Sequence, residues 1–272
     1  MTMTVPMTAD AATSVPTLYL SRLLLNPRHR AVRADLGDCN SLHRTIMRAF
    51  PSVPSNGGLA EKTGARERFD VLYRVDDDPR ARGPILLVQS RVVPAWWRLP
   101  ADYLVPARGG QAIADCKRVD ERYAAIAEGM ALSFRLRANP TRKIDTKSGP
   151  NGERRNGKRV ELRHEDDQLA WLRRKGEQHG FDLLATTVNP TVADVRASGV
   201  GKVTGSREKR AAVGEESGGG TLGGSSLTFG SVLFEGRLRV VDPSLIRDAL
   251  THGIGSGKAY GFGLLSIAPP RR

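Results

Sequence analysis

The sequence predicts an α+β protein with two ferredoxin-like (RRM-like) domains in tandem, each built on an antiparallel sheet. Its 272 residues correspond to about two domains of average size. In each half, strand-like segments alternate with helix-like segments, and Gly, Pro, Asn or Asp lies at most boundaries. We therefore expect a disordered N-terminal extension over residues 1–17, a first domain over 18–127 and a second domain over 128–272.

The first half predicts the order strand, helix, two strands, helix, strand. The apolar run over residues 18–25 ends at Asn26-Pro27, which favours a buried strand over a helix. Asp38 is suited to cap a helix in which Leu42 and Ile46 recur at helical spacing. The expected elements are a strand over 18–25, a basic loop over 28–37, a helix over 38–50, a hairpin of strands over 69–75 and 84–91, helical turns within 99–114 and a strand over 118–126.

The second half predicts the same order. Acidic residues over 165–167 begin a helix that basic residues over 173–175 end, and this order of charge complements the helix dipole. A Gly/Ser-rich stretch over 198–226 is expected to be a mobile loop, because it has too few apolar residues to order itself. The expected elements are strands over 131–138, 181–188, 227–241 and 263–268, and helices over 165–175 and 243–252.

The composition favours a polyanionic partner. Lys and Arg number 42 against 29 Asp and Glu, which leaves a formal net charge of +13 and points to nucleic acid. Only Cys39 and Cys116 are present, so a disulfide framework and a thiolate zinc site are both excluded and a reducing compartment is expected. No apolar run approaches the about 18 residues that span a bilayer. We expect a cytoplasmic protein without a membrane partner.

The segment from Arg135 to Arg163 is the most basic part of the chain, with ten basic residues against three acidic ones. Its Gly, Asn and Pro content predicts a flexible basic arm rather than a helix face. Such charge repels itself unless a polyanion neutralises it. A solvated loop is the alternative, but strand alternation places Arg135 and Arg137 on one face, which makes the sheet surface itself basic.

The loop over residues 253–263 contains five glycines between a helix and a strand. Glycines let a backbone approach a phosphate closely and direct consecutive N–H groups at it. A Walker loop is excluded, because His252 stands at its first glycine position and Ala259 at its Ser/Thr position. A dinucleotide fingerprint also fails, because Lys258 occupies the third glycine position. Tight turns that pack the last strand are the structural alternative.

The glycine spacing in this loop resembles that of the repeat-associated RNA-binding superfamily of CRISPR systems. Further stretches are similar to the CasE family, the pre-crRNA endoribonucleases of type I-E systems. They are Leu42-His43, the sequences FRLRANP over 134–140, QLAWLRRK over 168–175, FEG over 234–236 and GFGLLSIAP over 261–269. The resemblance runs from Leu18 to Pro269. It implies metal-independent cleavage of repeat RNA at the 3′ base of its hairpin, with no cofactor, and retention of the product in Cascade with its other subunits.

The resemblance also implies which residues act. His43 matches the catalytic histidine of the family, and Asn40 stands where the family has a helper tyrosine. Either that tyrosine is dispensable or another residue substitutes for it, with Tyr260 in the glycine-rich loop the candidate. Lys258 in the same loop is a candidate for stabilising the charged phosphate. From the residues alone, no cluster offers metal-ligand spacing, so an RNA 2′-OH has to be the nucleophile. A histidine titrates near pH 6.5, which suits His43 as general acid or as general base, and the sequence leaves that choice open.

The remaining site predictions concern RNA binding. Basic residues near the first helix, in the arm and in the glycine-rich loop are expected to contact the repeat hairpin, together with loop glycines. They are Arg28, Arg30, Arg44, Arg135, Arg137, Arg142, Lys143, Arg154, Arg155, Lys158, Arg159, Gly253, Gly255, Gly257, Lys258 and Gly261. Two alternatives to an enzyme remain open: an RNA-binding subunit that does not cut, which Asn40 favours, and a basic ribosome-associated protein.

Overall fold

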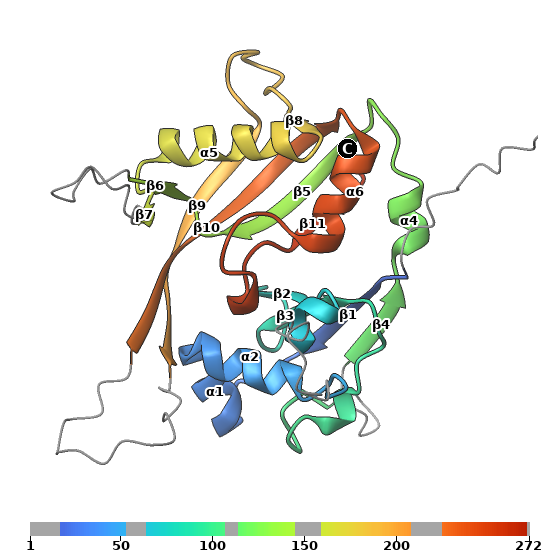
Figure 1. The fold of residues 1–272 in the computed structure, drawn as a ribbon, viewed down its shortest axis with the longest axis vertical. Coiled ribbons are helices and arrows are strands. Elements are labelled where there is room, and N and C mark those ends of the chain that lie inside the picture. Colours follow the sequence, from blue (N-terminus) through green and yellow to red (C-terminus); the bar gives the residue numbers. More distant parts are fainter. Residues whose placement is uncertain (1–16, 53–63, 107–113, 145–158, 208–224, 271–272) are drawn as a thin grey trace, which may run out of the picture.

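The computed structural model describes residues 17–52, 64–106, 114–144, 159–207 and 225–270. These form two larger antiparallel sheets joined by a short connection, and a separate two-stranded sheet (Figure 1). The first sheet has the order β2-β3-β1-β4 and the second has the order β11-β5-β10-β8. When these four strands of each sheet are numbered in chain order, both sheets have the order 2-3-1-4, with the second sheet read from β8 to β11. The strands are β1 (Tyr19–Leu24), β2 (Leu72–Asp76), β3 (Ile85–Ser90), β4 (Ala114–Arg118), β5 (Ala131–Ala138), β8 (Phe181–Leu183), β10 (Ser225–Val240) and β11 (Leu265–Ala268).

Both halves therefore repeat one topology, which confirms the predicted tandem ferredoxin-like fold. In the second half, helices α5 (Glu165–Gln178) and α6 (Pro243–His252) pack on one face of the sheet. Phe134 and Leu136 of β5 face these helices, whereas Arg135 and Arg137 lie on the opposite face, as strand alternation predicted. The predicted boundary between residues 127 and 128 lies between α4 and β5 and stays a prediction.

The first half holds helices α1 (Arg30–Gly37), α2 (Cys39–Met47) and α3 (Ala65–Arg68), and the 3-10 helix η1 (Trp96–Arg98). The predicted α2 forms because Asp38 Oδ1 accepts hydrogen bonds from the backbone N–H groups of Asn40 and Ser41. The expected basic loop over 28–37 is wrong, because α1 occupies most of it. His29 Nδ1 caps α1 by accepting from the backbone N–H of Ala31, and one face of the helix is buried.

The expected strand over 118–126 is also wrong, because β4 ends at Arg118 and helix α4 (Asp120–Ala124) follows. Val119, Tyr123 and Ile126 recur at helical spacing and pack into the core of the second sheet. Their four- and three-residue intervals, rather than strand alternation, describe this segment. Within the described residues, no helix is long and apolar enough to cross a membrane.

A long two-stranded ribbon leaves the second sheet and reaches α1 and α2 of the first half (Figure 1). It consists of β9 (Val195–Arg207) paired antiparallel with β10, and we call it the β9–β10 ribbon. The mobile loop expected over 198–226 is therefore wrong at both ends, and residues 208–224 lie outside the described residues. Backbone hydrogen bonds between β9 and β10 order this glycine- and serine-rich segment, which has few apolar residues to bury.

Buried polar side chains fix the two halves against each other. Arg74, which is 2% exposed, donates from Nη1 to the backbone oxygens of Arg135 at 3.2 Å and Leu264 at 3.1 Å. Its Nε donates to Asp76 at 2.7 Å, so the buried charge is paired. Gln89 Nε2 donates to the backbone oxygen of Leu250, at the end of α6, at 2.6 Å. These contacts hold the first sheet against β5, the end of α6 and the residue that follows the glycine-rich loop.

Candidate active site and RNA interface

His43 lies on α2, where Leu42 and Ile46 of the same helix face the first core. Its imidazole is only partly exposed, and its Nδ1 is buried with no hydrogen-bond partner among the described residues. The ring lies edge to face against the phenol ring of Tyr260, with centroids 6.4 Å apart. The structure thus brings together two side chains that are distant in sequence and were both predicted to act.

The surroundings of His43 favour its neutral form. Burial, and then the nearby charge of Arg66, lower the pKa of His43 below the ordinary value of 6.5. Protonation would place a second N–H on a ring whose Nδ1 has no acceptor in the described structure. At neutral pH the imidazole is therefore uncharged and able to accept a proton.

Tyr260 lies at the point where three elements meet. It ends the 3-10 helix η2 (Lys258–Tyr260) in the glycine-rich loop, and its ring stacks on Phe229 of β10 at 5.1 Å between centroids. The hydroxyl of Tyr73, on β2, donates to the backbone oxygen of Ala259 at 2.9 Å. The sequence did not identify Phe229, Tyr73 or Arg66 as site residues, because each reaches the site only through tertiary packing.

Asn40 occupies the first turn of α2, one turn before His43. Its Nδ2 donates to the backbone oxygen of Ser206 on β9 at 2.9 Å. The amide thus binds the β9–β10 ribbon.

The predicted phosphate-binding glycines have structural reasons of their own. Gly253 and Gly261 are buried and have φ values of +77° and +86°, which favour glycine. A Cβ on Gly261 would lie 3.2 Å from the ring of Tyr73. Gly255 and Gly257 are partly exposed, and Gly255 lies against Trp171. Phosphate binding by this loop stays a prediction.

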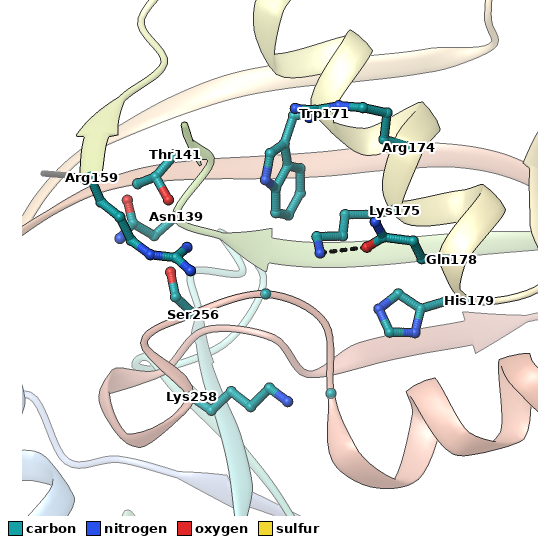
Figure 2. Close-up of a pocket in the computed structure, with 12 residues that line it drawn as sticks. Asn139, Thr141, Arg159, Trp171, Arg174, Lys175, Gln178, His179, Ser256 and Lys258 are labelled. Atoms are coloured by element: carbon teal, nitrogen blue, oxygen red, sulfur yellow. Dashed lines mark hydrogen bonds between the residues drawn. The ribbon is translucent and has the colours of Figure 1, made fainter. Parts of the chain in front are cut away.

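A basic cavity of about 450 Å³ opens between α5, the end of β5, strand β7 (Arg159–Glu161) and the glycine-rich loop (Figure 2). The side chains of Arg159, Lys175 and Lys258 surround this space, with Arg174 and His179 also in its wall. Lys175 donates to Gln178 at 2.7 Å and lies 6.0 Å from the centre of the Trp171 ring.

The two lysines of the cavity are held in a way that favours an anionic ligand. Burial, and then the charges of Arg174 and Arg159, lower the pKa of Lys175. Burial and then the charge of Arg66 likewise lower the pKa of Lys258. An anion in the cavity would relieve this repulsion. Of these residues the sequence identified Arg159 and Lys258, whereas it assigned Arg174 and Lys175 only to the end of a helix.

The other predicted RNA-binding residues occupy several surfaces. Arg28, Arg30 and Arg44 are exposed in the first half. Arg142 and Lys143 are exposed on β6 (Thr141–Lys143), which pairs with β7 at the base of the basic arm. Arg154, Arg155 and Lys158 lie outside the described residues.

Arg135 and Arg137 each have side-chain partners within the protein. Arg135 donates from Nε to Glu235 at 2.7 Å and lies 3.5 Å from Asp76, so carboxylates offset its charge. Arg137 donates from Nε to Ser231 Oγ at 2.7 Å and lies over the ring of Phe262. In the described part of the chain, no group of three or more His, Cys, Asp or Glu residues is arranged to hold a metal ion.

The tandem ferredoxin-like fold, the basic cavity and the histidine at the junction of the two halves define a protein of the RNA-binding class. More particularly, the chain belongs to the family described as CRISPR-associated protein, whose family model matches residues 18–269. It is 34% identical over 252 residues to the CRISPR-associated endoribonuclease Cse3 of Thermus thermophilus. It is 28% identical over 254 residues to the CRISPR system Cascade subunit CasE of Escherichia coli. Each alignment covers 93% of this chain and 100% of the relative.

Solved structures agree with this assignment. The structure of endoribonuclease Cse3 bound to a 19-nucleotide RNA is 31% identical, with a TM-score of 0.65, over 93% of this chain and 100% of that one. The crystal structure of Cas6e from Escherichia coli is 26% identical, with a TM-score of 0.58, at the same coverage.

Proposed function

We propose that this protein is an endoribonuclease that cleaves CRISPR precursor RNA at the 3′ base of the repeat hairpin without a metal ion. The mature crRNA stays bound, and the protein remains with it as a subunit of Cascade. The observation that carries this proposal is a neutral, partly buried His43 against Tyr260, near a cation-lined cavity. The relationship to Cse3, which has been solved with an RNA representing a pre-cleavage complex, supports it.

The chemistry uses the nucleophile that the RNA itself carries. Neutral His43 accepts the proton of the 2′-OH next to the scissile phosphate, and the resulting 2′ oxygen attacks phosphorus. The bond from phosphorus to the 5′ oxygen of the next nucleotide breaks, and that oxygen takes up a proton. The products are a 2′,3′-cyclic phosphate and a 5′-hydroxyl. Tyr260 and Lys258 supply donors for the charge on the phosphoryl oxygens.

The repeat hairpin is bound mainly through its phosphates. The cavity around Lys175 and Lys258 takes backbone phosphates, and the basic arm follows the duplex and enters its deep major groove. The other Cascade subunits are protein partners, as the name of the Escherichia coli relative states for that protein. The cytoplasm is the place of action, where reducing conditions suit the unpaired Cys39 and Cys116.

Cleavage in the presence of a chelator tests the function. The full chain is incubated with the repeat RNA of its own genome in excess EDTA, beside an RNA with a 2′-deoxy nucleotide upstream of the scissile phosphate. We expect the first RNA to be cut to a cyclic phosphate and the second to be bound but left intact. Binding of both RNAs without cutting would instead identify a non-catalytic RNA-binding subunit. Cutting of the deoxy RNA at the normal site would show that water is the nucleophile.

A further inference from the structure

The end of the β9–β10 ribbon is bound closely to the first turn of α2. Asp38 Oδ2 accepts from the backbone N–H of Ser206 at 3.0 Å and also from its hydroxyl. Asn40 Nδ2 donates to the backbone oxygen of the same serine at 2.9 Å. All three polar groups of Ser206 are therefore bound by two side chains of one helix turn. We call this set of hydrogen bonds the ribbon latch.

Gly205 allows the ribbon to approach this closely. A Cβ at this position would lie 2.7 Å from Cys39 Sγ and 3.2 Å from the backbone nitrogen of Asn40. Any side chain there would push the ribbon away from α2. The close approach therefore depends on the missing side chain at Gly205 as well as on the hydrogen bonds from Asp38 and Asn40.

The β9–β10 ribbon connects the ribbon latch to the candidate active site. In the β9–β10 register, Ser206 pairs with Ser226 and Val203 pairs with Phe229. Phe229 stacks on Tyr260, and Tyr260 lies edge to face against His43. His43 is three residues after Asn40, on the same side of α2. The contacts thus run from Asn40 on α2, through the β9–β10 ribbon and Tyr260, back to His43 on the same helix.

We propose that Asn40 is a positioning residue, which docks the β9–β10 ribbon so that Phe229 holds Tyr260 against His43. The inference rests on the proposed function for its link to cleavage. Asn40 then acts on Tyr260, which lies at the other end of this series of contacts. The contact of Tyr73 with Ala259 restrains Tyr260 from the other side, so losing the latch weakens the arrangement without abolishing it.

The latch remains intact at neutral pH. Partial burial raises the pKa of Asp38, but hydrogen bonds from the Ser206 hydroxyl and from backbone N–H groups lower it overall below its ordinary value. The carboxylate is therefore ionised at neutral pH, where His43 is uncharged. The latch and the neutral imidazole exist together at neutral pH.

Two variants break the latch from opposite sides. Asn40→Ala removes the amide donor without adding a charge near His43, and alanine is well tolerated in a helix. Gly205→Ala pushes the ribbon outward and leaves Asn40 unchanged. Asn26→Ala is the control, because Asn26 Nδ2 also donates to a distant backbone oxygen, that of Asp102, at 3.0 Å, and its Oδ1 accepts from the backbone N–H of Arg28.

The readouts are the NMR titration of His43, single-turnover cleavage, and binding of the 2′-deoxy hairpin. The His43 signal is identified by its absence in His43→Ala. We expect both latch variants to admit water to the imidazole and move the pKa of His43 up toward 6.5. Cleavage should slow by about three- to tenfold, the worth of one hydrogen bond, with binding unchanged. Adding Tyr260→Phe should cost less in the Asn40→Ala background than in the wild type.

The control variant should match the wild type in all three measurements. If Asn40→Ala and Gly205→Ala leave the titration of His43 where the wild type has it, the latch has no positioning role and the proposal is wrong. Equal shifts in the Asn26→Ala control would show only a general effect on stability and would also contradict the proposal. A wild-type protein that binds RNA without cutting it would refute the proposed function, while the titration would still decide the latch.

Discussion

His43 owes its chemistry to neighbours that do not share its sequence environment. A solvated histidine on a helix titrates near pH 6.5. Here burial and then Arg66 lower the pKa, and Nδ1 has no acceptor among the described residues to stabilise a second proton. A base with a lowered pKa remains available at neutral pH, although it is a weaker base.

The pH dependence of cleavage should show the lowered pKa of His43 directly. Cleavage that needs neutral His43 rises with pH through the lowered pKa, so its acidic limb should lie below pH 6.5. Arg66→Gln removes a repelling charge and should move that limb upward, with burial still holding it below 6.5. Arg68→Gln, on the same short helix but exposed, is the control and should leave the limb in place. An acidic limb that is the same in both variants would contradict this account of His43.

At the scale of elements, the glycine-rich loop is placed by close packing as much as by its sequence. Gly261 ends η2 with a φ of +86° and lies against the ring of Tyr73. Tyr260 immediately precedes it, so the conformation at Gly261 sets the direction from which the phenol meets His43.

Gly261→Ala should therefore weaken both stability and cleavage. The left-handed conformation costs an alanine about 1–2 kcal/mol, and the contact with Tyr73 adds to that. The control is Gly129→Ala, because Gly129 also has a positive φ, +79°, but a Cβ there would meet no atom within 4 Å. Denaturant unfolding should show a larger loss for Gly261→Ala, and only this variant should slow cleavage. Normal cleavage by a folded Gly261→Ala protein would argue against the placement of Tyr260 as part of the site.

The elements that the sequence predicted are those with local signals. Helix α2 has a capping Asp38 and apolar residues at helical spacing, and β5 alternates strictly. The prediction of a strand over the α4 segment was wrong although Val119, Tyr123 and Ile126 recur at helical spacing, because the segment is too short for that spacing to stand out. The β9–β10 ribbon has the composition of a loop, because pairing between strands, rather than burial, orders it.

The candidate site was likewise predicted only where the sequence carries a local signal. His43 and Tyr260 were predicted from motifs, whereas Tyr73, which holds the loop, is 186 residues from its partner Ala259. Arg66 and Phe229 lie in segments without a motif. No spacing rule links residues that meet only after the two halves pack together.

For the whole molecule, the net charge is +13, and the cation-lined cavity adjoins the base of the basic arm, since Thr141 of β6 and Arg159 of β7 line it. The hairpin of β6 and β7 lies on the side opposite β4 and α4 (Figure 1). Polyanion binding should therefore depend on where a charge lies as well as on how many there are.

The salt dependence of RNA binding measures how much the position of a charge matters. Replacing Arg142 and Lys143 together by Gln should flatten the slope of log affinity against log salt by about 1.4–1.8, if each contacts one phosphate. Replacing Lys117 and Arg122 by Gln removes the same charge from β4 and α4 and should change the slope little. Equal slopes in the two double variants would show that the arm contributes only through the overall charge.

The central claim is that His43 performs the proton transfer while other residues hold the RNA, and one comparison tests it most directly. His43→Ala and the wild type are each given the repeat hairpin, and binding and single-turnover cleavage are measured on the same samples. Affinity should be retained, since it resides in the cationic surface, and cleavage should fall by about 10²–10⁴-fold, the usual contribution of one acid–base group. Full cleavage by His43→Ala would contradict the account and move the proton transfer to another residue, with Tyr260 and Lys258 the first to be tested.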